Sequence, residues 1–511
     1  MKKTGWLLYT LALLKLFLPY LLQNGAYEPH RDEYLYLAEG QHMAWGYMEV
    51  PPLLSVFAWL THLFGNGMFW IKFWPSLGGA ATYLLVGKLI LHQGGKAFAL
   101  FLAWTPFIFG AYLRTHFLFQ PGFLDIFFWT ALGYALVRYK ATGLNRYLYI
   151  AGICMGLGML SKYDMALYIT ALLLGLSLTA HRKIFLNKHL YFAGVIGLLL
   201  FLPNFLWQYS KGFPVVFHMR ELQKNQLQYV SPGNFVAGQF LFFAPCIVIW
   251  VRGLVSLAVG KTYRFVAWSY GFVIAILLIT HGKDYYSLGA YPLLFVFGAV
   301  ALETRLTGRL YGFRVALGVV ILGIGFFMIR VLMPILPPAQ LADLYARRHL
   351  ARFGVLRWED GKDHPLQQDF ADMLAWKEMT AKFAHAYDLL DSTEKKHTLL
   401  FCDNYGQAGA VNYYGPQYHL PPACSDNASF LYWLPDNFAD FDNIVLLTDD
   451  THEMEHSFIH NFRQAILVDS VTNPYAREYG SLIILLKGPD STVKKMFVAK
   501  IEADKKKTSP E

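Results

Sequence analysis

Long hydrophobic runs follow one another along the first two thirds of the chain, separated by short polar stretches. A helix of about 20 apolar residues crosses the roughly 30 Å hydrocarbon core of a bilayer, and tilt accommodates shorter ones. The runs therefore predict a polytopic α-helical protein with about eleven transmembrane helices. They cover residues 6–22, 70–91, 97–112, 123–137, 147–160, 165–180, 190–207, 235–251, 265–280, 287–302 and 315–336.

One apolar segment, Leu53–Phe64, is too short to cross. Its 12 residues would reach about 18 Å as a helix, so we expect it to lie in the membrane interface, within an external first loop at 24–67. With Lys2 and Lys3 inside, one set of loops carries sixteen basic residues and one acid, whereas the opposite set carries seven basic residues and nine acids. Because basic loops tend to stay in the cytoplasm, the first set is predicted to be cytoplasmic.

The composition changes after Pro338. Residues 340–511 hold eighteen Lys or Arg and twenty-five Asp or Glu, which is typical of a soluble domain. Short β-rich runs alternate with helical stretches there and predict a small α/β domain, with strands at 398–402, 443–448, 465–471 and 482–486. We therefore expect a membrane domain at 1–338, an external α/β domain at 339–500 and a disordered tail at 501–511.

Composition supports the membrane class. Hydrophobic residues make up 55% of the chain and charged residues only 15%, where a soluble protein has about a quarter charged. The net charge of +9 follows from membrane orientation, so it does not indicate nucleic-acid binding. Cys154 and Cys246 lie in apolar runs. Cys402 and Cys424 both lie in the external domain, where a disulfide could form, but the sequence does not give their separation.

Polar residues gather in five groups on the predicted external side. Together they place several cations and at least two carboxylates on one membrane face, which suits an anionic, lipid-anchored substrate. Taken singly, each group has a simpler interpretation, such as a local ion pair, a snorkelling lysine or the ordinary aromatic belt. The groups are Arg31-Asp32-Glu33-Tyr34, Arg114-Thr115-His116 with Asp125, Ser161-Lys162-Tyr163-Asp164, the loop 204–234 with His218 and Arg220, and Gly282-Lys283-Asp284-Tyr285-Tyr286.

This ordered set resembles the polytopic GT-C glycosyltransferases of the protein O-mannosyltransferase-like superfamily, which includes the bacterial lipid A aminoarabinose transferases. The resemblance covers residues 1–335 and rests on Asp32-Glu33-x-x-Tyr36, Pro51-Pro52-Leu53, Arg114 with Asp125, Ser161-Lys162-Tyr163, and Lys283-x-Tyr285-Tyr286 with Tyr291-Pro292. It implies an enzyme that takes a sugar from a polyprenyl-phosphate carrier and transfers it to a lipid or glycan acceptor. The reaction would occur on the outer face of a bacterial cytoplasmic membrane.

The resemblance and the chemistry of the residues assign candidate roles. Asp32 is the expected catalytic carboxylate of a single inverting displacement, as a general base or as a charge stabiliser. One departure matters, because the aminoarabinose transferases carry a Lys directly before the Pro-Pro pair, whereas Met48-Glu49-Val50 precedes it here. The candidates are Asp32, Glu33 and Asp125 for catalysis, Lys162, Lys283, Arg114, Arg220, Tyr285 and Tyr286 for the donor phosphate, and Tyr36, His116 and His218 for the substrates.

Some alternatives stay open at this point. A divalent metal could be shared by Asp32 and Asp125, but two carboxylates far apart in sequence do not establish a site. A transporter or lipid flippase would also place charges in a membrane cavity, although internal repeats and charges near mid-membrane would then be expected. A scaffold that binds envelope partners through the external domain would leave the charges at the membrane edge unexplained.

Overall fold

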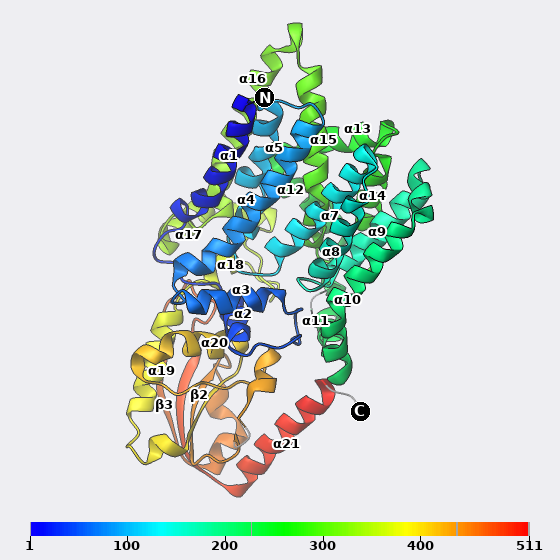
Figure 1. Ribbon diagram of the computed structural model, residues 1–511. Coiled ribbons are helices and arrows are strands. Elements are labelled where there is room, and N and C mark those ends of the chain that lie inside the picture. Colours follow the sequence, from blue (N-terminus) through cyan, green and yellow to red (C-terminus); the bar gives the residue numbers. More distant parts are fainter. Residues whose placement is uncertain (1, 226, 436–437, 509–511) are drawn as a thin grey trace.

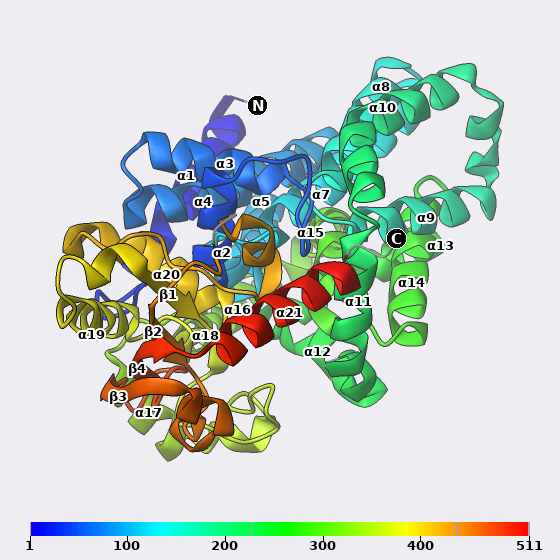
Figure 2. The same ribbon diagram turned by 90° about the horizontal axis from the view of Figure 1, so that it is seen from below.

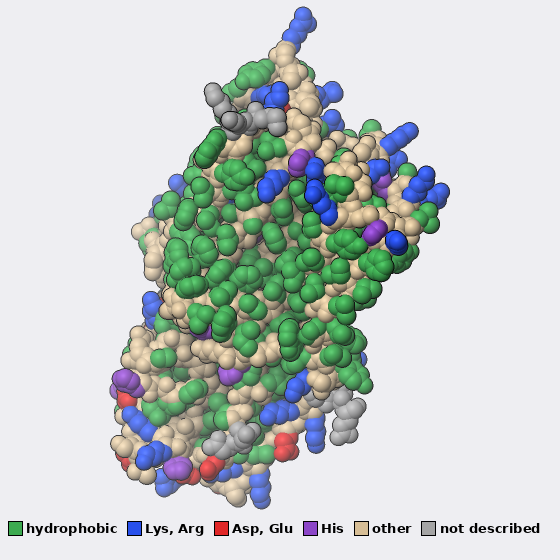
Figure 3. All heavy atoms as spheres, in the orientation of Figure 1, with side chains coloured by type: hydrophobic (Ala, Val, Ile, Leu, Met, Phe, Trp, Pro, Cys, Tyr) green, Lys and Arg blue, Asp and Glu red, His purple; other side chains and the backbone are tan. Residues whose placement is uncertain are grey.

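The computed structural model describes residues 2–225, 227–435 and 438–508. An elongated bundle of helices lies above a smaller part that is built on a four-stranded sheet (Figure 1). On the face shown in Figure 3, hydrophobic side chains cover the bundle in a broad band, Lys and Arg lie at both ends, and most of the Asp and Glu lie on the sheet part. An apolar band of this kind is the surface that a protein presents to hydrocarbon.

The bundle consists mainly of helices that run along its length (Figure 1). Among the described residues, four helices are long and apolar enough to cross a membrane, or up to six if each of two bent pairs forms one span. Others, such as α5 and α14, are apolar but shorter, so the predicted number of about eleven spans is not confirmed. The helices are α1 (Lys2–Leu21), α4 (Met68–His92), α5 (Ala97–Phe109), α6 (Tyr112–Thr115), α7 (Gly122–Thr142), α8 (Arg146–Met159), α9 (Asp164–Ser177), α10 (Lys188–Ser210), α11 (Pro214–Asn225), α12 (Pro232–Leu241), α13 (Ile247–Val259), α14 (Arg264–Ile279), α15 (Tyr291–Arg305) and α16 (Gly312–Leu332).

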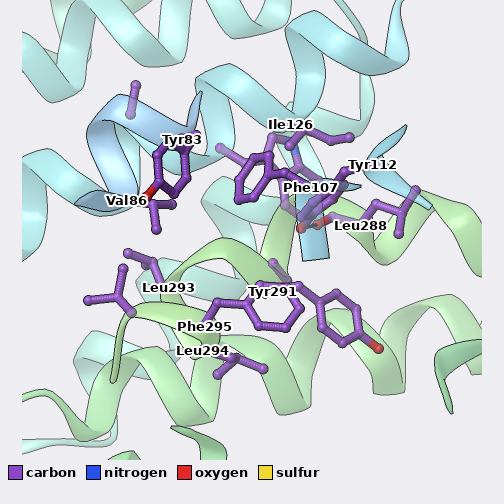
Figure 4. Close-up of a cluster of buried hydrophobic side chains, with 14 of the residues drawn as sticks. Tyr83, Val86, Phe107, Tyr112, Ile126, Leu288, Tyr291, Leu293, Leu294 and Phe295 are labelled. Carbon is purple, nitrogen blue, oxygen red and sulfur yellow. Dashed lines mark hydrogen bonds between the residues drawn. The ribbon is translucent and has the colours of Figure 1, made fainter. Parts of the chain in front are cut away.

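Small residues allow neighbouring helices of the bundle to approach closely. A Cβ atom on Gly298 of α15 would overlap the carbonyl oxygen of Ile249 on α13. Such contacts are common in membrane bundles, where close packing holds helices together. Figure 4 shows the interior, in which large side chains from several helices meet, and the Tyr112 hydroxyl donates a hydrogen bond to the Leu288 carbonyl (2.7 Å).

Two short helices, α2 (Arg31–Gln41) and α3 (Leu53–Leu63), lie between the bundle and the sheet (Figure 1). Both belong to the segment that joins α1 to α4. Helix α3 has 11 residues, too few to span a bilayer, which agrees with the interfacial segment expected there. The two helices pack tightly, since a Cβ atom on Gly40 would lie only 2.6 Å from the Cβ of Ala58.

The sheet has the strand order β1-β2-β4-β3, in which β1 and β2 are parallel and β4 is antiparallel to both of its neighbours. Alternate residues face opposite sides of a strand. Leu400 and Val445 accordingly pack on the side of α19 and α20, whereas Phe401 and Leu446 pack on the side of α21. All four predicted strands are confirmed. The elements are α17 (Pro338–Arg347), α18 (Gln368–Ala371), α19 (Trp376–Asp388), β1 (Thr398–Cys402), α20 (Tyr405–Tyr414), β2 (Asn443–Thr448), β3 (Phe462–Ser470), β4 (Leu482–Pro489) and α21 (Ser491–Thr508).

The end of the chain differs from the prediction. The disordered tail expected at 501–511 is instead helical through Thr508, and 509–511 lie outside the described residues. Helix α21 runs from the sheet towards α11 beneath the bundle (Figure 2), and its Ile501 is fully buried in an apolar cluster with Leu431, which explains its order. Cys402 and Cys424 are free thiols, joined only through a backbone hydrogen bond of 2.9 Å.

Candidate active site

A cavity of about 1970 Å³ lies between the end of the bundle and the sheet part. Its walls come from α2, α7, α11 and α16, from the loop before α15, and from the C-terminal part. Small-molecule pockets usually enclose roughly 300–1,000 Å³, so this one has room for two substrates. Ten of the twelve predicted site residues line it: Asp32, Tyr36, Arg114, Asp125, Lys162, His218, Arg220, Lys283, Tyr285 and Tyr286.

Asp32 stands in the first turn of α2. His30 caps the helix, because its Nδ1 accepts a hydrogen bond from the Asp32 N–H (3.1 Å) and the Glu33 carboxylate accepts one from the His30 N–H (2.8 Å). The Asp32 side chain is 31% exposed. Its Oδ2 accepts a hydrogen bond from Gln120 Nε2 (3.1 Å) and its Oδ1 accepts one from the Tyr405 hydroxyl (2.7 Å). Each carboxylate oxygen has a second lone pair, so Asp32 can still accept a bond from a ligand in the cavity.

Glu33, predicted as a catalytic neighbour of Asp32, does not line the cavity. Its carboxylate is fully buried, and each of the two oxygens lies 2.6 Å from Lys72 Nζ. The carboxylate also accepts a hydrogen bond from the Phe119 N–H (2.6 Å). Successive residues of a helix point about 100° apart, and here Asp32 lines the cavity whereas Glu33 points to Lys72 on α4. A catalytic role for Glu33 stays a prediction, and the geometry favours a structural one, because this side chain forms a buried ion pair that joins α2 to α4.

His116, predicted to bind substrate, also lies outside the cavity. Its ring is fully buried, with ring centroids 5.9 Å from Phe107 and 5.4 Å from Tyr112. It follows the short helix α6 and turns towards α4, where a Cβ atom on Gly79 would lie 2.7 Å from the His116 Cβ. Substrate binding by His116 stays a prediction that this position does not favour, because the side chain packs into the bundle.

Lys162 and Lys283 share a pair of tyrosines at the cavity wall. Lys162 Nζ lies 4.1 Å from the ring centroid of Tyr286 and 5.8 Å from that of Tyr285. Lys283 Nζ lies 5.9 Å from the Tyr285 centroid, and the two rings meet edge to face at 4.8 Å. The sequence separates these lysines by more than a hundred residues, and the fold brings both ammonium groups to one aromatic pair. Cations beside aromatic faces are stabilised by the ring electrons.

Acidic side chains surround both lysines. Lys162 Nζ lies 2.5 Å from Asp164 Oδ2, and Lys283 Nζ lies 3.7 Å from Glu359 Oε1. Asp125 on α7 is close enough to Lys162 to interact with its charge. Asp125 is only 4% exposed, and its Oδ1 has no hydrogen-bond partner among the described residues. A buried carboxyl oxygen without a partner is costly unless a ligand or water satisfies it.

Arg114 lines the cavity, but residues of α16 and the C-terminal part already engage its guanidinium. Its Nη1 donates to Asp369 Oδ2 (2.7 Å), its Nη2 to Gln367 Oε1 (2.6 Å), and its Nε to the Leu332 carbonyl (3.0 Å). An arginine offers five N–H donors in a fixed fork. Most of these N–H groups hold the C-terminal part against α16, so few donors of Arg114 remain for the predicted contact with a phosphate.

The remaining predicted residues lie on two helices. Helix α11 carries His218 and the exposed Arg220, and α2 carries Tyr36. Burial, and then the nearby charge of Asp32, raises the pKa of Tyr36 well above its usual value. Tyr36 is therefore a neutral hydroxyl that can donate a hydrogen bond at neutral pH.

Several ionisable residues of the cavity were not predicted as site residues, and four of them form one cluster: His30, Asp369, Asp372 and Arg477. His30 Nε2 lies 3.5 Å from Asp372 Oδ2 and 3.9 Å from Asp369 Oδ1, and Arg477 Nη1 lies 3.4 Å from Asp372 Oδ1. Burial raises the pKa of Asp372 to about 6, against the lowering effect of the His30 and Arg477 charges. No motif indicated these residues, because distant segments meet only once the C-terminal part has docked.

A shared metal site for Asp32 and Asp125 finds little support in the geometry. In the described part of the chain, one group of three His, Cys, Asp or Glu residues has donor atoms within 4.8 Å of one another, and it consists of Asp450, Glu453 and His456 after β2. None of these three lines the cavity. Divalent cations such as Ca²⁺ and Mg²⁺ require several oxygen ligands, and no third carboxylate or imidazole joins Asp32 and Asp125 within the described ranges.

An apolar helix bundle that carries a charged cavity at one end, closed by an α/β part, is the architecture of a polytopic membrane protein, as the resemblance to the GT-C glycosyltransferases implies. The comparisons with known proteins agree. The model of the family described as "Dolichyl-phosphate-mannose-protein mannosyltransferase" matches residues 49–207, a segment that contains Arg114, Asp125 and Lys162. A search of curated proteins found no match to the chain.

Two solved structures of ArnT from Cupriavidus metallidurans share the fold. The structure bound to undecaprenyl phosphate is 14% identical in sequence, with a TM-score of 0.61, and the match covers 95% of this chain and 100% of that one. The apo structure is 13% identical, with a TM-score of 0.62 and coverage of 96% and 100%. The family model and the shared fold indicate a glycosyltransferase and confirm the resemblance that the sequence predicted.

Proposed function

We propose that this protein transfers a sugar from a polyprenyl-phosphate carrier to a lipid or glycan acceptor on the outer face of a bacterial cytoplasmic membrane. The observation that carries the proposal is the cavity, which brings the carboxylates Asp32 and Asp125 and the ammonium groups of Lys162 and Lys283 to one end of an apolar bundle. The ArnT structure bound to undecaprenyl phosphate holds a ligand of this class.

The donor phosphate would lie near Lys162 and Lys283. Both ammonium groups are near the ring of Tyr285, so one phosphate can contact both. Ion pairs of this kind are the strongest polar contacts available to a phosphate. The apolar wall formed by α16, with Phe327 and Val331 facing the cavity, offers a path for the prenyl chain towards the membrane.

The chemistry would be a single displacement at the anomeric carbon. The acceptor hydroxyl oxygen forms the new bond to this carbon while the bond to the phosphate oxygen breaks, and the electron pair leaves with the polyprenyl phosphate. Asp32 takes the hydroxyl proton, a step typically worth about 10²–10⁴ in rate. Lys162 and Lys283 stabilise the negative charge that develops on the phosphate. Attack from the opposite face inverts the anomeric configuration.

An acceptor phosphate would change the role of Asp32. Such an acceptor is already ionised at neutral pH, so it needs no general base. Asp32 would then orient the sugar and stabilise the positive charge of the oxocarbenium-like transition state. Asp125 would bind a sugar hydroxyl in either case, a role supported by its one carboxyl oxygen without a partner among the described residues.

The orientation follows from the charges of the loops. The cavity lies at the end of the bundle next to the sheet part, and the loops at that end belong to the set with fewer basic residues. Basic loops tend to stay in the cytoplasm. The cavity and the C-terminal part would therefore face the outside, where polyprenyl-linked sugars would be used.

The test is release of polyprenyl phosphate by the purified full-length protein in detergent. A panel of polyprenyl-phosphate sugars serves as donors, and total envelope lipid serves as acceptor. We expect one donor to be consumed, and Asp32→Asn to lower the rate at least about 10²-fold. Asp343→Asn removes a surface carboxylate that pairs with Arg347 (2.9 Å) outside the cavity, so it is the matched control.

Folded protein is compared by gel filtration and thermal unfolding for all three proteins. No release from any donor would contradict the transferase proposal and favour a transporter. Equal release by the wild type and Asp32→Asn would retain the transferase but remove Asp32 from its mechanism.

A further inference from the structure

The C-terminal part reaches into the cavity through helix α20, which packs directly on α2 (Figures 1 and 2). Two glycines allow this approach. A Cβ atom on Gly409 would lie 2.8 Å from the Cβ of Tyr34, and one on Gly406 would lie 2.5 Å from the Cγ of Arg31. The backbone of α20 therefore lies against the first turn of α2, where Asp32 stands.

The first residue of α20 is Tyr405, and it bonds directly to the candidate catalytic carboxylate. Its hydroxyl donates to Asp32 Oδ1 at 2.7 Å, across 373 positions of sequence. Gln120 donates to the other oxygen, Oδ2, at 3.1 Å. The Arg31 guanidinium carbon lies 4.5 Å from the centre of the Tyr405 ring, which holds the ring from one face.

We propose that Tyr405 is a positioning residue for the transfer reaction, and that the C-terminal part thereby completes the active site. This inference rests on the proposed function of Asp32. A carboxylate on a short side chain can rotate about χ1 and χ2, and a donor on each oxygen selects one orientation. The lone pairs that remain free then face the cavity, where an acceptor hydroxyl would approach.

Tyr405 acts on Asp32 only through its hydroxyl. The ring would keep its contact with Arg31 if the hydroxyl were absent, so Tyr405→Phe separates positioning from docking of the domain. A hydrogen bond to a charged group contributes roughly 10- to 100-fold in equilibrium terms. Part of that contribution would appear in the rate, since a misplaced base is a poor proton acceptor.

The experiment compares Tyr405→Phe with Tyr414→Phe in the full-length protein, using the donor identified above. Tyr414 lies on the same helix, and its hydroxyl meets that of Tyr34 at 3.3 Å, away from Asp32. We expect Tyr405→Phe to lower kcat about tenfold or more while KM for the donor changes little. Tyr414→Phe should leave both constants near the wild-type values. A matching loss of kcat in both variants, or a change confined to KM, would overturn the proposal.

A double-mutant cycle tests whether Tyr405 works through Asp32. In the Asp32→Asn background, Tyr405→Phe should cause no further loss of rate, because the base that it positions is already absent. If the two losses multiply, Tyr405 acts independently of Asp32 and the proposal is wrong. An Asp32→Asn protein with full activity would instead contradict the proposed role of Asp32, so the two failures can be told apart.

Discussion

Replacing Lys72 by Met removes the cation beside the buried carboxylate of Glu33. The two side chains are at most 1% exposed, and Lys72 Nζ lies 2.6 Å from both oxygens of Glu33. The carboxylate also accepts hydrogen bonds from the N–H groups of Phe119 and His30. A single substitution therefore leaves one buried charge without its partner, whereas a double substitution removes both charges.

The magnitude follows from this geometry. Breaking a buried ion pair by removing one partner costs about 3–5 kcal/mol, whereas replacing both partners is often close to neutral. We expect Lys72→Met and Glu33→Gln each to lower the free energy of unfolding by about this amount. Gln keeps an acceptor oxygen for the two backbone N–H groups. The double variant should therefore lose less than either single variant, which gives a coupling energy of at least about 2 kcal/mol.

The assay is reversible unfolding of the four proteins in mixed detergent micelles, followed by circular dichroism, with turnover measured on the same samples. The double variant should recover both folded protein and activity relative to the single variants. Losses that simply add would refute the ion-pair reasoning. A stable Glu33→Gln protein without turnover would also refute it, since it would return Glu33 to the catalytic machinery.

Two further results are expected. Lys162→Met and Lys283→Met should each raise KM for the donor about tenfold or more, because each removes a charged contact to the phosphate; an unchanged KM in either variant would exclude that lysine from the donor site. The raised pKa of Asp372, about 6 against 3.8 for an ordinary Asp, means that the folded protein binds more protons than the unfolded chain between these pH values. As pH rises from about 4 to about 6, the free energy of unfolding of the wild type should therefore fall relative to that of Asp372→Asn. Unfolding midpoints that change in parallel for the two proteins over this range would contradict the raised pKa of Asp372.

The strands and the long helices could be predicted because each has its own local pattern of apolar residues. Residues 444–447 are apolar on both faces and are covered on both faces in the structure, and the polar Asn443 and Thr448 mark the ends of the strand as predicted. The number of spans could not be confirmed in the same way. Helices such as α5 and α14 gain burial from their neighbours, so their length and composition alone do not mark them as membrane helices.

The candidate site residues were selected by two properties, the predicted side of the membrane and the type of residue. Those two properties selected Asp32, Lys162 and Lys283, which lie in different segments of the chain and line one cavity. They could not give the direction in which a side chain points, which is why Glu33 and His116 were expected at the cavity and lie outside it. The docking of the C-terminal part onto α2 could not be predicted either, because nothing in the sequence around Tyr405 indicates that it contacts Asp32.

The departure at Met48-Glu49-Val50 fits the same docking. Where the aminoarabinose transferases carry a Lys before the Pro-Pro pair, Val50 lines the cavity, so the cations near the proposed phosphate come from other segments. Glu49 instead accepts hydrogen bonds from the Ser429 N–H (2.7 Å) and hydroxyl (2.6 Å). The loop between α1 and α4 thus binds the C-terminal part at successive points, through Glu28 to the Lys377 N–H, Asp32 to Tyr405, Glu49 to Ser429, and Asn66 to Tyr413. The C-terminal part is thus held along the whole loop that carries Asp32, the candidate base, and can control its geometry. For this reason Tyr405→Phe should affect kcat although Tyr405 lies outside the helix bundle.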